Sequence, residues 1–483
     1  MNTVNEDRVR QIVEEVVQRV VRTPAAPGAA AGSGSGSGTD RRGSGVGLFT
    51  SVEEAVAAAD RAQQELLGLT LEQRKQIIEA IRQTTRDHAA TFSRMALEET
   101  GIGRLEDKLK KHALAADLTP GVEDLESVSW TGDHGLTVEE MAPYGVVCAV
   151  TPSTHPVPTL VNNAIGIIAA GNSVVVNPHP GAKSVSAHAV QLLNVAIVKA
   201  GGPANLIAAI SEPTIETADK LFHHRTVRLV LVTGGAAVAR AAMRSGKKAI
   251  AAGPGNPPVL VDETADIKRA ARDIIDGAAF DNNVLCIGEK QCFVVDSVAD
   301  ELKREMLAYS AVELDRAQIQ ALTEVALPKG DDGQPHVNRD FVGRNANVLG
   351  AAIGLTLDDE LRVLIGETDA HHPFVEVEQM MPFLPIVRVR NVDEGIRAAI
   401  ESEHGYRHTA VIHSRNIENM HNMARAVDTT VFVKNGPSFA GLGVGGEGYA
   451  TYSIAGPTGE GMTTARTFTR RRRCALIDYF RIT

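Results

Sequence analysis

Along residues 1–22 the apolar positions fall on one face of a helix. Valine and isoleucine recur at i, i+3 and i+4 spacing, with charged residues and glutamine between them. Thr3 and Glu6 are spaced as in a capping box, which starts a helix, and Thr23-Pro24 ends the pattern. We therefore predict an amphipathic helix over residues 1–22. Its apolar stripe consists of Val9, Ile12, Val13, Val16, Val17, Val20 and Val21.

The next segment, residues 23–47, is dominated by Ala, Gly, Ser and Pro. Such a composition cannot bury a core, so it should act as a flexible tether that spans roughly 25–30 Å on average. A helix on a tether has two interpretations. It docks on its own subunit, or it is an address tag that lays its apolar stripe in a partner's groove. Because a long flexible spacer provides reach rather than packing, we expect the address tag.

From Val52 to about Gly121 the apolar spacing is helical, and after Pro143 short apolar runs alternate with helical ones. Strands that alternate with helices at this spacing predict a doubly wound α/β fold with a parallel sheet. The expected strands are 146–150, 174–176, 229–233 and 259–261, and the expected helices are 160–170 and 236–244.

The composition narrows the range of partners. A length of 483 residues allows two or three packed domains. A net charge of −10 argues against a nucleic-acid-binding surface, and the most apolar stretch is interrupted by asparagine and glycine. We therefore expect no nucleic-acid partner and no membrane span. The one dense basic run, residues 470–473, is expected to be a solvated face or a site of ion pairs between subunits.

The four cysteines are not equivalent. Their irregular spacing indicates a reducing compartment, and without CxxC or HExxH motifs we expect no metal site. Cys148 and Cys292 lie in apolar runs, where a thiol acts as a small hydrophobe, and Cys474 follows the basic run. Cys286 alone follows a polar turn and precedes an apolar strand at 292–295. A lone cysteine is more often inert than catalytic, so this window makes Cys286 only a candidate nucleophile.

Thr233-Gly234-Gly235 ends one expected strand and precedes an expected helix. Glycines let a phosphate approach the backbone, and a helix N-terminus offers free N–H groups and the positive end of its dipole. The motif is not the GxGxxG fingerprint, so a tight strand-to-helix turn explains it equally well on local evidence. Its place at the carboxyl end of a parallel strand favours a ligand site.

Taken together, the motifs resemble those of the aldehyde dehydrogenase superfamily. Within it they are similar to the CoA-acylating aldehyde dehydrogenases of bacterial microcompartments, of the propionaldehyde and ethanolamine-pathway type. The resemblance runs from about Val52 to the C-terminus, and the order of the motifs makes the set specific. The motifs are Ala142-Pro143-Tyr144-Gly145-Val146-Val147, Thr151-Pro152-Ser153-Thr154-His155-Pro156, Ala169-Ala170-Gly171-Asn172-Ser173, Asn177-Pro178-His179-Pro180, Thr233-Gly234-Gly235, Glu378-Gln379-Met380-Met381-Pro382 and Pro457-Thr458-Gly459-Glu460-Gly461.

The resemblance implies a domain arrangement. A Rossmann-like NAD-binding domain would comprise residues 48–126 and 141–253, and an α/β catalytic domain would comprise residues 254–462. Residues 127–140 and 463–483 would form a small β oligomerisation hairpin of a homo-oligomer, a dimer or a tetramer. The helix at residues 1–22 would then bind a shell or cargo protein and direct the enzyme to the microcompartment lumen in the bacterial cytoplasm.

The resemblance also implies the site residues. Cys286 falls at the nucleophile, and Glu378 matches the glutamate that holds the nicotinamide ribose. His155 stands where the subfamily usually carries an oxyanion-hole asparagine. Its N–H could replace that amide, or the oxyanion could rest on the backbone N–H of Cys286. The remaining cofactor residues are Thr151, Pro152, Asn177, Pro178, His179, Thr233, Gly234 and Gly235.

The second nucleophile is indicated by a missing residue. In hydrolytic relatives a glutamate activates water, and Ala251 stands at the matching position. This absence favours coenzyme A as the acyl acceptor. NAD is favoured over NADP because no obvious arginine stands near His179.

We thus expect oxidation of propionaldehyde, acetaldehyde or lactaldehyde to its acyl-CoA. The alternatives are a hydrolytic aldehyde dehydrogenase, a semialdehyde or acyl-phosphate reductase of the same superfamily, and a non-catalytic interaction protein that carries the tag helix.

Overall fold

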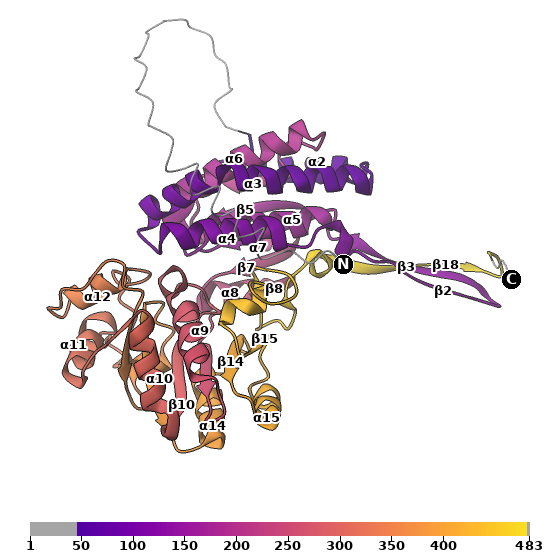
Figure 1. Ribbon diagram of the computed structural model, residues 1–483. Helices are drawn as coiled ribbons and strands as arrows, with labels where there is room; N and C mark the ends of the chain where they lie inside the picture. The colour runs from indigo at the N-terminus through magenta and orange to yellow at the C-terminus, as the bar shows by residue number, and fades with distance from the viewer. Residues whose placement is uncertain (1–45, 481–483) are drawn as a thin grey trace, which may run out of the picture.

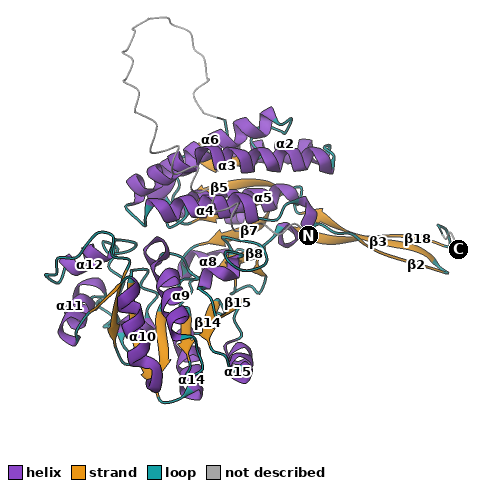
Figure 2. Cartoon of the chain, viewed as in Figure 1, coloured by secondary structure: helices purple, strands orange, loops and turns teal. Residues whose placement is uncertain are grey.

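Strands of two to seven residues, most of them apolar runs, form two separate parallel sheets. A third, antiparallel sheet extends from the body as an arm (Figure 1). The computed structural model describes residues 46–480. The predicted helix at 1–22 and nearly all of the predicted linker lie outside the described residues. The predicted α/β class is confirmed, with helices on both faces of the parallel sheets (Figure 2).

The first sheet has six parallel strands and contains the strands predicted at 146–150, 174–176 and 229–233. Successive residues of its central strands face opposite helical layers, so the strands are buried on both faces and read as continuous apolar runs. In spatial order the strands are β1 (Leu48–Phe49), β6 (Ile207–Ile210), β5 (Ser173–Pro178), β4 (Val146–Thr151), β7 (Val227–Thr233) and β8 (Lys248–Ala252).

Helices cover both faces of this sheet. The long helix α3 begins at a capping box, in which the Thr70 hydroxyl accepts from Gln73 N and the Gln73 side chain accepts from Thr70 N. One face packs against α3 (Leu71–Thr100), α5 (Pro156–Ala169) and α6 (Lys183–Lys199), and α4 (Leu105–Leu118) packs on α3 and α5. The opposite face packs against α2 (Val52–Leu67), α7 (Ile215–His223) and α8 (Ala236–Met243).

The second sheet has seven parallel strands and includes the strands predicted at 259–261 and 292–295. Its strands, in spatial order, are β11 (Ala311–Glu313), β12 (Val363–Glu367), β13 (Phe383–Val389), β10 (Gln291–Val295), β9 (Pro258–Val261), β14 (Thr409–His413) and β15 (Val431–Lys434). The helices of this half are α9 (Ile267–Ala279), α10 (Asp296–Tyr309), α11 (Arg316–Ala326), α12 (Ala346–Ala351), α13 (Pro373–Glu376), α14 (Val392–Glu403) and α15 (Ile417–Val427).

The two predicted oligomerisation segments meet in one three-stranded antiparallel sheet. β3 (Gly135–Pro143) pairs with both β2 (Val128–Gly132) and β18 (Thr469–Ile477), and the three strands project from the body as an arm (Figure 1). The basic run lies exposed on β18, where Arg471 and Arg473 form ion pairs with Glu139 of the same chain. A role of the arm between subunits stays a prediction.

The cysteines behave as their surroundings in the sequence indicate. Cys148 and Cys292 are fully buried, Cys474 is exposed on the arm, and Cys286 is partly exposed; all four thiols are free. Among residues 46–480 there is no helix with the length and apolarity needed to cross a bilayer.

The buried side chain of His112, in α4, makes the stability of the fold depend on pH. The side chain is buried, stacks on Phe92 with ring centroids 5.9 Å apart, and its Nδ1 lies 2.8 Å from the carbonyl oxygen of Lys108. Burial, assisted by the positive charges of Lys111 and Lys108, lowers the pKa of His112 to about 3. The native histidine is therefore neutral down to strongly acidic pH.

We expect His112 to make the protein less stable in mild acid. An unfolded histidine titrates near ~6.5, so below that pH the unfolded state binds more protons than the native state. The stabilisation is present in full above about pH 6.5 and is lost as the pH falls towards 3. At about pH 5 this group alone should lower the free energy of unfolding by about 2 kcal/mol.

The measurement is the free energy of unfolding in urea at about pH 7.5 and about pH 5, for wild type and for His112→Gln. Between the two pH values the wild type should lose about 2 kcal/mol more than the variant, because glutamine does not titrate. Equal losses in the two proteins would show that His112 is not held neutral.

Candidate active site

The predicted cofactor residues gather at one edge of the first sheet. Because β5, β4 and β7 are parallel neighbours, their carboxyl ends place Pro178 beside Thr151 and bring Thr233 to the same edge. Thr233 is in turn paired with Ala252 at the end of β8. This is the edge at which open α/β sheets bind ligands.

Thr233-Gly234-Gly235 forms the turn from β7 into α8, as predicted. Gly235 is the N-cap of α8 and its φ is −63°, so the backbone does not require glycine, and an added Cβ would meet nothing within 4 Å. The glycine therefore leaves open space in front of an uncapped helix N-terminus, which fits an incoming phosphate. The Thr233 side chain is held in place by a hydrogen bond, since its hydroxyl lies 2.6 Å from the hydroxyl of Ser453.

Two cofactor candidates at this edge are engaged within the chain. Asn177 accepts a hydrogen bond from the Thr217 hydroxyl at 2.7 Å, and His179 Nδ1 accepts from Gly181 N at 3.0 Å. Burial and then the charge of Arg339 lower the pKa of His179. The fold thus brings an arginine from far along the sequence towards His179, which the local sequence did not indicate.

Thr151 and Pro152 lead from β4 towards α5. The Thr151 carbonyl accepts from His179 N at 3.0 Å, whereas its buried hydroxyl has no hydrogen-bond partner among the described residues. A buried hydroxyl without a partner at a ligand-binding edge is available to a bound molecule. The edge as a whole therefore fits a dinucleotide.

Cys286 lies in the turn that leads into β10, as predicted. The preceding residues Asp281, Asn282 and Asn283 all adopt the left-handed region, with φ of 47°, 55° and 65°. Aspartate and asparagine tolerate this region better than other residues with a side chain. The sequence Asp-Asn-Asn thus makes the sharp turn that presents Cys286.

The two asparagines fix this turn rather than only cap it. Asn282 Nδ2 donates to the carbonyl of Gly343 at 2.9 Å, and Asn283 Nδ2 donates to the carbonyl of Glu289 at 2.8 Å. Asp281 is anchored at its backbone, because its N–H donates to the Asp107 carboxylate at 2.9 Å.

Cys286, Glu378 and His408 converge on Gly255, in the connection from β8 to β9. A Cβ at position 255 would lie 2.5 Å from the carbonyl oxygen of Cys286 and 2.9 Å from the His408 ring. Gly255 N donates to the Glu378 carboxylate at 3.2 Å. Only glycine fits there, and through it the carboxyl edge of the first sheet meets the cysteine turn of the second.

The surroundings of the Cys286 thiol largely oppose its ionisation. Desolvation, and then the negative charge of Glu378, raises the pKa of Cys286 to about 12, while the charge of Lys290 lowers it. Desolvation raises the pKa of the Glu378 carboxyl to about 7, and Lys290 again opposes the shift. Burial lowers the pKa of His408 to about 4, so this imidazole is neutral at pH 7.

Ala251 lies inside β8 and is fully buried. Its N–H donates to the Thr458 hydroxyl at 3.1 Å, so the C-terminal motif packs directly on this strand. A methyl group at this position cannot take a proton from water.

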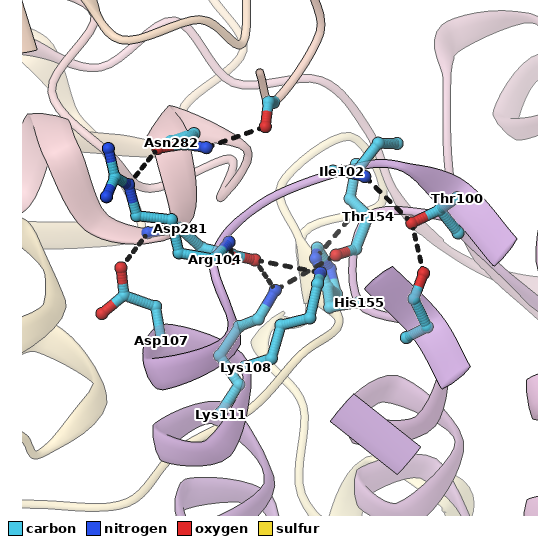
Figure 3. Close-up of polar contacts among 12 residues, drawn as sticks. Thr100, Ile102, Arg104, Asp107, Lys108, Lys111, Thr154, His155, Asp281 and Asn282 are labelled. Atoms are coloured by element: carbon cyan, nitrogen blue, oxygen red, sulfur yellow. Dashed lines mark hydrogen bonds and ion pairs between the residues drawn. The ribbon is translucent and has the colours of Figure 1, made fainter. Parts of the chain in front are cut away.

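His155 lies beside a buried charge cluster that the sequence did not indicate. Figure 3 shows Lys108 and Lys111 reaching from α4 to the Asp281 carboxylate, and Lys111 Nζ also donates to the Thr154 carbonyl at 3.1 Å. The His155 Nδ1 lies 2.9 Å from the Thr154 hydroxyl. Burial and the two lysines lower the pKa of His155 well below its usual value, so the ring is neutral.

Through Lys111 this cluster joins Thr154, in the loop before α5, to Asp281, in the turn before Cys286, and His155 is the neighbour of Thr154 in that loop. The placement is compatible with an oxyanion donor, and that role stays a prediction. Four residues of the site were not predicted from the sequence: Lys108, Lys111, Lys290 and His408. For the three lysines a signal was available, because a lysine at a position that faces the core must find a buried partner. For His408 no such signal was available.

Comparisons with known proteins identify the family of this chain. The aldehyde dehydrogenase family model matches residues 49–318. The acetylating acetaldehyde dehydrogenase EutE of Salmonella typhimurium is 54% identical over 439 residues, which is 90% of this chain and 94% of that protein.

Solved structures with similar folds include two propionaldehyde dehydrogenases. One, from the Clostridium phytofermentans fucose utilisation bacterial microcompartment, has a TM-score of 0.88 and 44% identity, over 91% of this chain and all of the other. The second, from Rhodopseudomonas palustris with bound propionyl-CoA, has a TM-score of 0.87 and 46% identity, over 89% of this chain and 95% of the other. With the family model, the sequence identity and the shared fold in agreement, this chain belongs to the aldehyde dehydrogenase family.

Proposed function

We propose that this protein oxidises a short-chain aldehyde to its acyl-CoA, with Cys286 as the nucleophile and NAD as the hydride acceptor. The observation that carries the proposal is the meeting of Cys286, Glu378 and His408 at Gly255. Four residues earlier in the chain, the buried Ala251 stands where hydrolytic relatives hold a base. The relative with a bound propionyl-CoA supports a thioester product.

The chain's residues divide the chemistry into two steps. The Cys286 thiolate attacks the aldehyde carbon, and the resulting oxyanion is stabilised by N–H donors such as those of the Cys286 backbone or His155. NAD held at the edge of the first sheet would supply the acceptor for the hydride that leaves this adduct as the thioester forms. The Cys286 thioester is then cleaved by the CoA thiol, which releases acyl-CoA and restores the cysteine.

The edge of the first sheet would hold the dinucleotide. The open space at Gly235 and the N-terminus of α8 suit its phosphates, and Glu378 suits a ribose hydroxyl, because its carboxylate accepts hydrogen bonds. NAD stays our choice over NADP, although Arg339 lies close enough to affect His179.

Product analysis tests the proposal. Purified protein is assayed with acetaldehyde, propionaldehyde or lactaldehyde, with NAD or NADP and with or without CoA, and both NADH and the acyl product are measured. Acyl-CoA formed in a one-to-one ratio with NADH is the expected result. These aldehydes differ by a methyl or hydroxyl group, so we expect preferences of roughly 10–200-fold. Free carboxylic acid as the main product would favour the hydrolytic alternative.

The arm supports assembly into a homo-oligomer, a dimer or a tetramer. Its strands and the residues that follow β18 expose large apolar side chains that a single subunit leaves uncovered, and such surfaces commonly mark contacts between proteins. They are Val128, Trp130, Leu476, Ile477, Tyr479 and Phe480.

Residues 1–22 are proposed to direct the enzyme into a microcompartment lumen by binding a shell or cargo protein. The support is the regular spacing of apolar residues in this segment, which precedes a stretch rich in glycine, serine and alanine, together with a similar structure from a microcompartment. Deleting residues 1–45 should leave kcat and KM in dilute solution within about twofold of wild type, since every residue assigned to the proposed site lies far beyond this segment in the sequence. The deletion should also abolish co-purification with shells.

A series of substitutions tests whether shell binding depends on the apolar stripe or on any part of residues 1–22. Glu at Ile12, Val16 and Val20 should remove co-assembly as fully as the deletion, whereas Glu at Arg8, Gln18 and Arg19 on the polar face should not. A reporter fused to residues 1–45 should collect in the compartments. Diffuse reporter signal, or shell binding by the truncated enzyme, would instead indicate a helix that packs on its own subunit.

A further inference from the structure

Lys290 is a fully buried lysine at the start of β10. Its Nζ donates to the carbonyl oxygens of Asn283 at 2.8 Å and Leu285 at 3.0 Å, and to the Asn283 side-chain oxygen. An ammonium group has three N–H donors, so the three acceptors use all of them. The side chain therefore closes residues 283–290 into a ring that contains Cys286.

This ammonium group forms no ion pair within 4 Å in the described part of the chain. The titratable groups that face it are Glu289, Glu378, His408 and Cys286. The two carboxyls bind neutral donors instead: Glu289 accepts from the Ser438 hydroxyl at 2.7 Å, and Glu378 accepts from Gly255 N. Lys290 is thus a positive charge held by carbonyl groups of the turn that contains the proposed nucleophile.

A buried ammonium group without an ion-pair partner lowers the stability of the fold, so its presence suggests a role in function. Burying an ammonium group costs several kcal/mol even after relaxation, and an apolar residue of similar volume would pack at this position without that cost. If the only task were to close the ring, neutral donors would serve. In the proposed reaction the Cys286 thiolate gains from a positive charge, and the charge of Lys290 lowers the pKa of this thiol.

We infer that Lys290 is a positioning residue that closes the Cys286 ring and supplies the buried positive charge that favours the thiolate. The inference rests on the proposed role of Cys286. Two independent features support it, namely the hydrogen bonds from Nζ to the ring and, among residues 46–480, the absence of a carboxylate within ion-pair distance of Nζ. Burial lowers the pKa of Lys290 to about 8, so the charge is present below that pH and is lost above it.

The test is the rate of alkylation of Cys286 by iodoacetamide as a function of pH, in the full-length chain. Peptide mass spectrometry follows the Cys286 peptide, and the exposed Cys474 in the same sample is the internal reference for the reagent. Three variants divide the functions of the side chain. Lys290→Met removes charge and donors, Lys290→Gln removes the charge but keeps two N–H donors, and Lys290→Arg keeps both.

At pH 7 the Met and Gln variants should alkylate Cys286 about tenfold more slowly than wild type, which corresponds to a thiol pKa about one unit higher. The difference should shrink above about pH 8, where wild-type Lys290 itself loses its charge. Lys290→Arg should stay within about threefold of wild type. In aldehyde oxidation, kcat should fall with the alkylation rate while KM for NAD changes less than about twofold.

A purely structural lysine would give a different result. In that case the melting temperature falls in the Met variant, but the alkylation profiles of correctly folded Met or Gln variants coincide with wild type, and the inference is wrong. If Lys290→Met does not fold, Lys290→Gln decides. A failure of the proposed function is detected by a separate experiment: if Cys286 is not the nucleophile, Cys286→Ala keeps its aldehyde-oxidation activity. The alkylation rates still show whether Lys290 favours the Cys286 thiolate.

Discussion

Replacing Cys286 by alanine is expected to abolish aldehyde oxidation, with a loss of at least about 10³-fold in kcat. The methyl group cannot form the bond to the aldehyde carbon, so neither hydride transfer nor the thioester can follow. NAD binding, measured by titration calorimetry, should change little, because the dinucleotide residues lie on the first sheet and Cys286 lies in the turn before β10.

Two other cysteines are matched controls for this variant. Cys148 and Cys292 are fully buried, and their burial raises the thiol pKa far from neutrality. Cys148→Ala and Cys292→Ala should therefore keep kcat and lower the free energy of unfolding by about 1 kcal/mol through lost packing. Turnover close to normal in Cys286→Ala would rule out this cysteine as the nucleophile.

Without CoA the enzyme is expected to release at most about one NADH per active site and then stop. The thioester on Cys286 would persist because Ala251 presents only a buried methyl group at the position of the water-activating base. Rapid mixing with aldehyde and NAD should show a burst of NADH, and intact-mass analysis should show the acyl group on the protein. Addition of CoA to the stalled enzyme should restart turnover.

Glu378 provides the sharpest control for this experiment. Its carboxyl has a pKa raised to about 7 and lies beside Cys286, so it is the side chain best placed to activate water slowly. Any slow release of acid without CoA should therefore decrease in Glu378→Gln. Sustained turnover without CoA that survives this substitution would require a base elsewhere and would favour the hydrolytic alternative.

Much of the fold could be predicted from the sequence because its strands are local apolar runs. The runs at 146–150, 174–176, 229–233, 259–261 and 292–295 all lie within strands, since each is buried on both faces and carries no polar alternation. The strands of the arm gave no such signal. β18 is a row of arginines exposed to solvent, so only its resemblance to a family indicated a pairing with β3.

The sequence by itself indicated the candidate nucleophile and the strand-to-helix turn proposed for a phosphate. Both depend on residue types within a few positions: a cysteine after Asp-Asn-Asn, and glycines between a strand and a helix. The missing base, alanine in place of glutamate, was implied by the resemblance to a family. The contrast between Cys286 and the buried Cys148 and Cys292 could be read in the same way, because burial follows local hydrophobicity.

Only the tertiary structure decided which distant groups share the site. Gly255 brings Glu378 and His408 to Cys286, Lys111 joins Asp281 to Thr154, and Lys290 turns back on the loop that precedes it. These contacts join residues up to 170 positions apart and depend on side-chain directions, which no local pattern encodes. The ionisation of the thiol depends on burial and on these few charges, so it is a property of the folded chain.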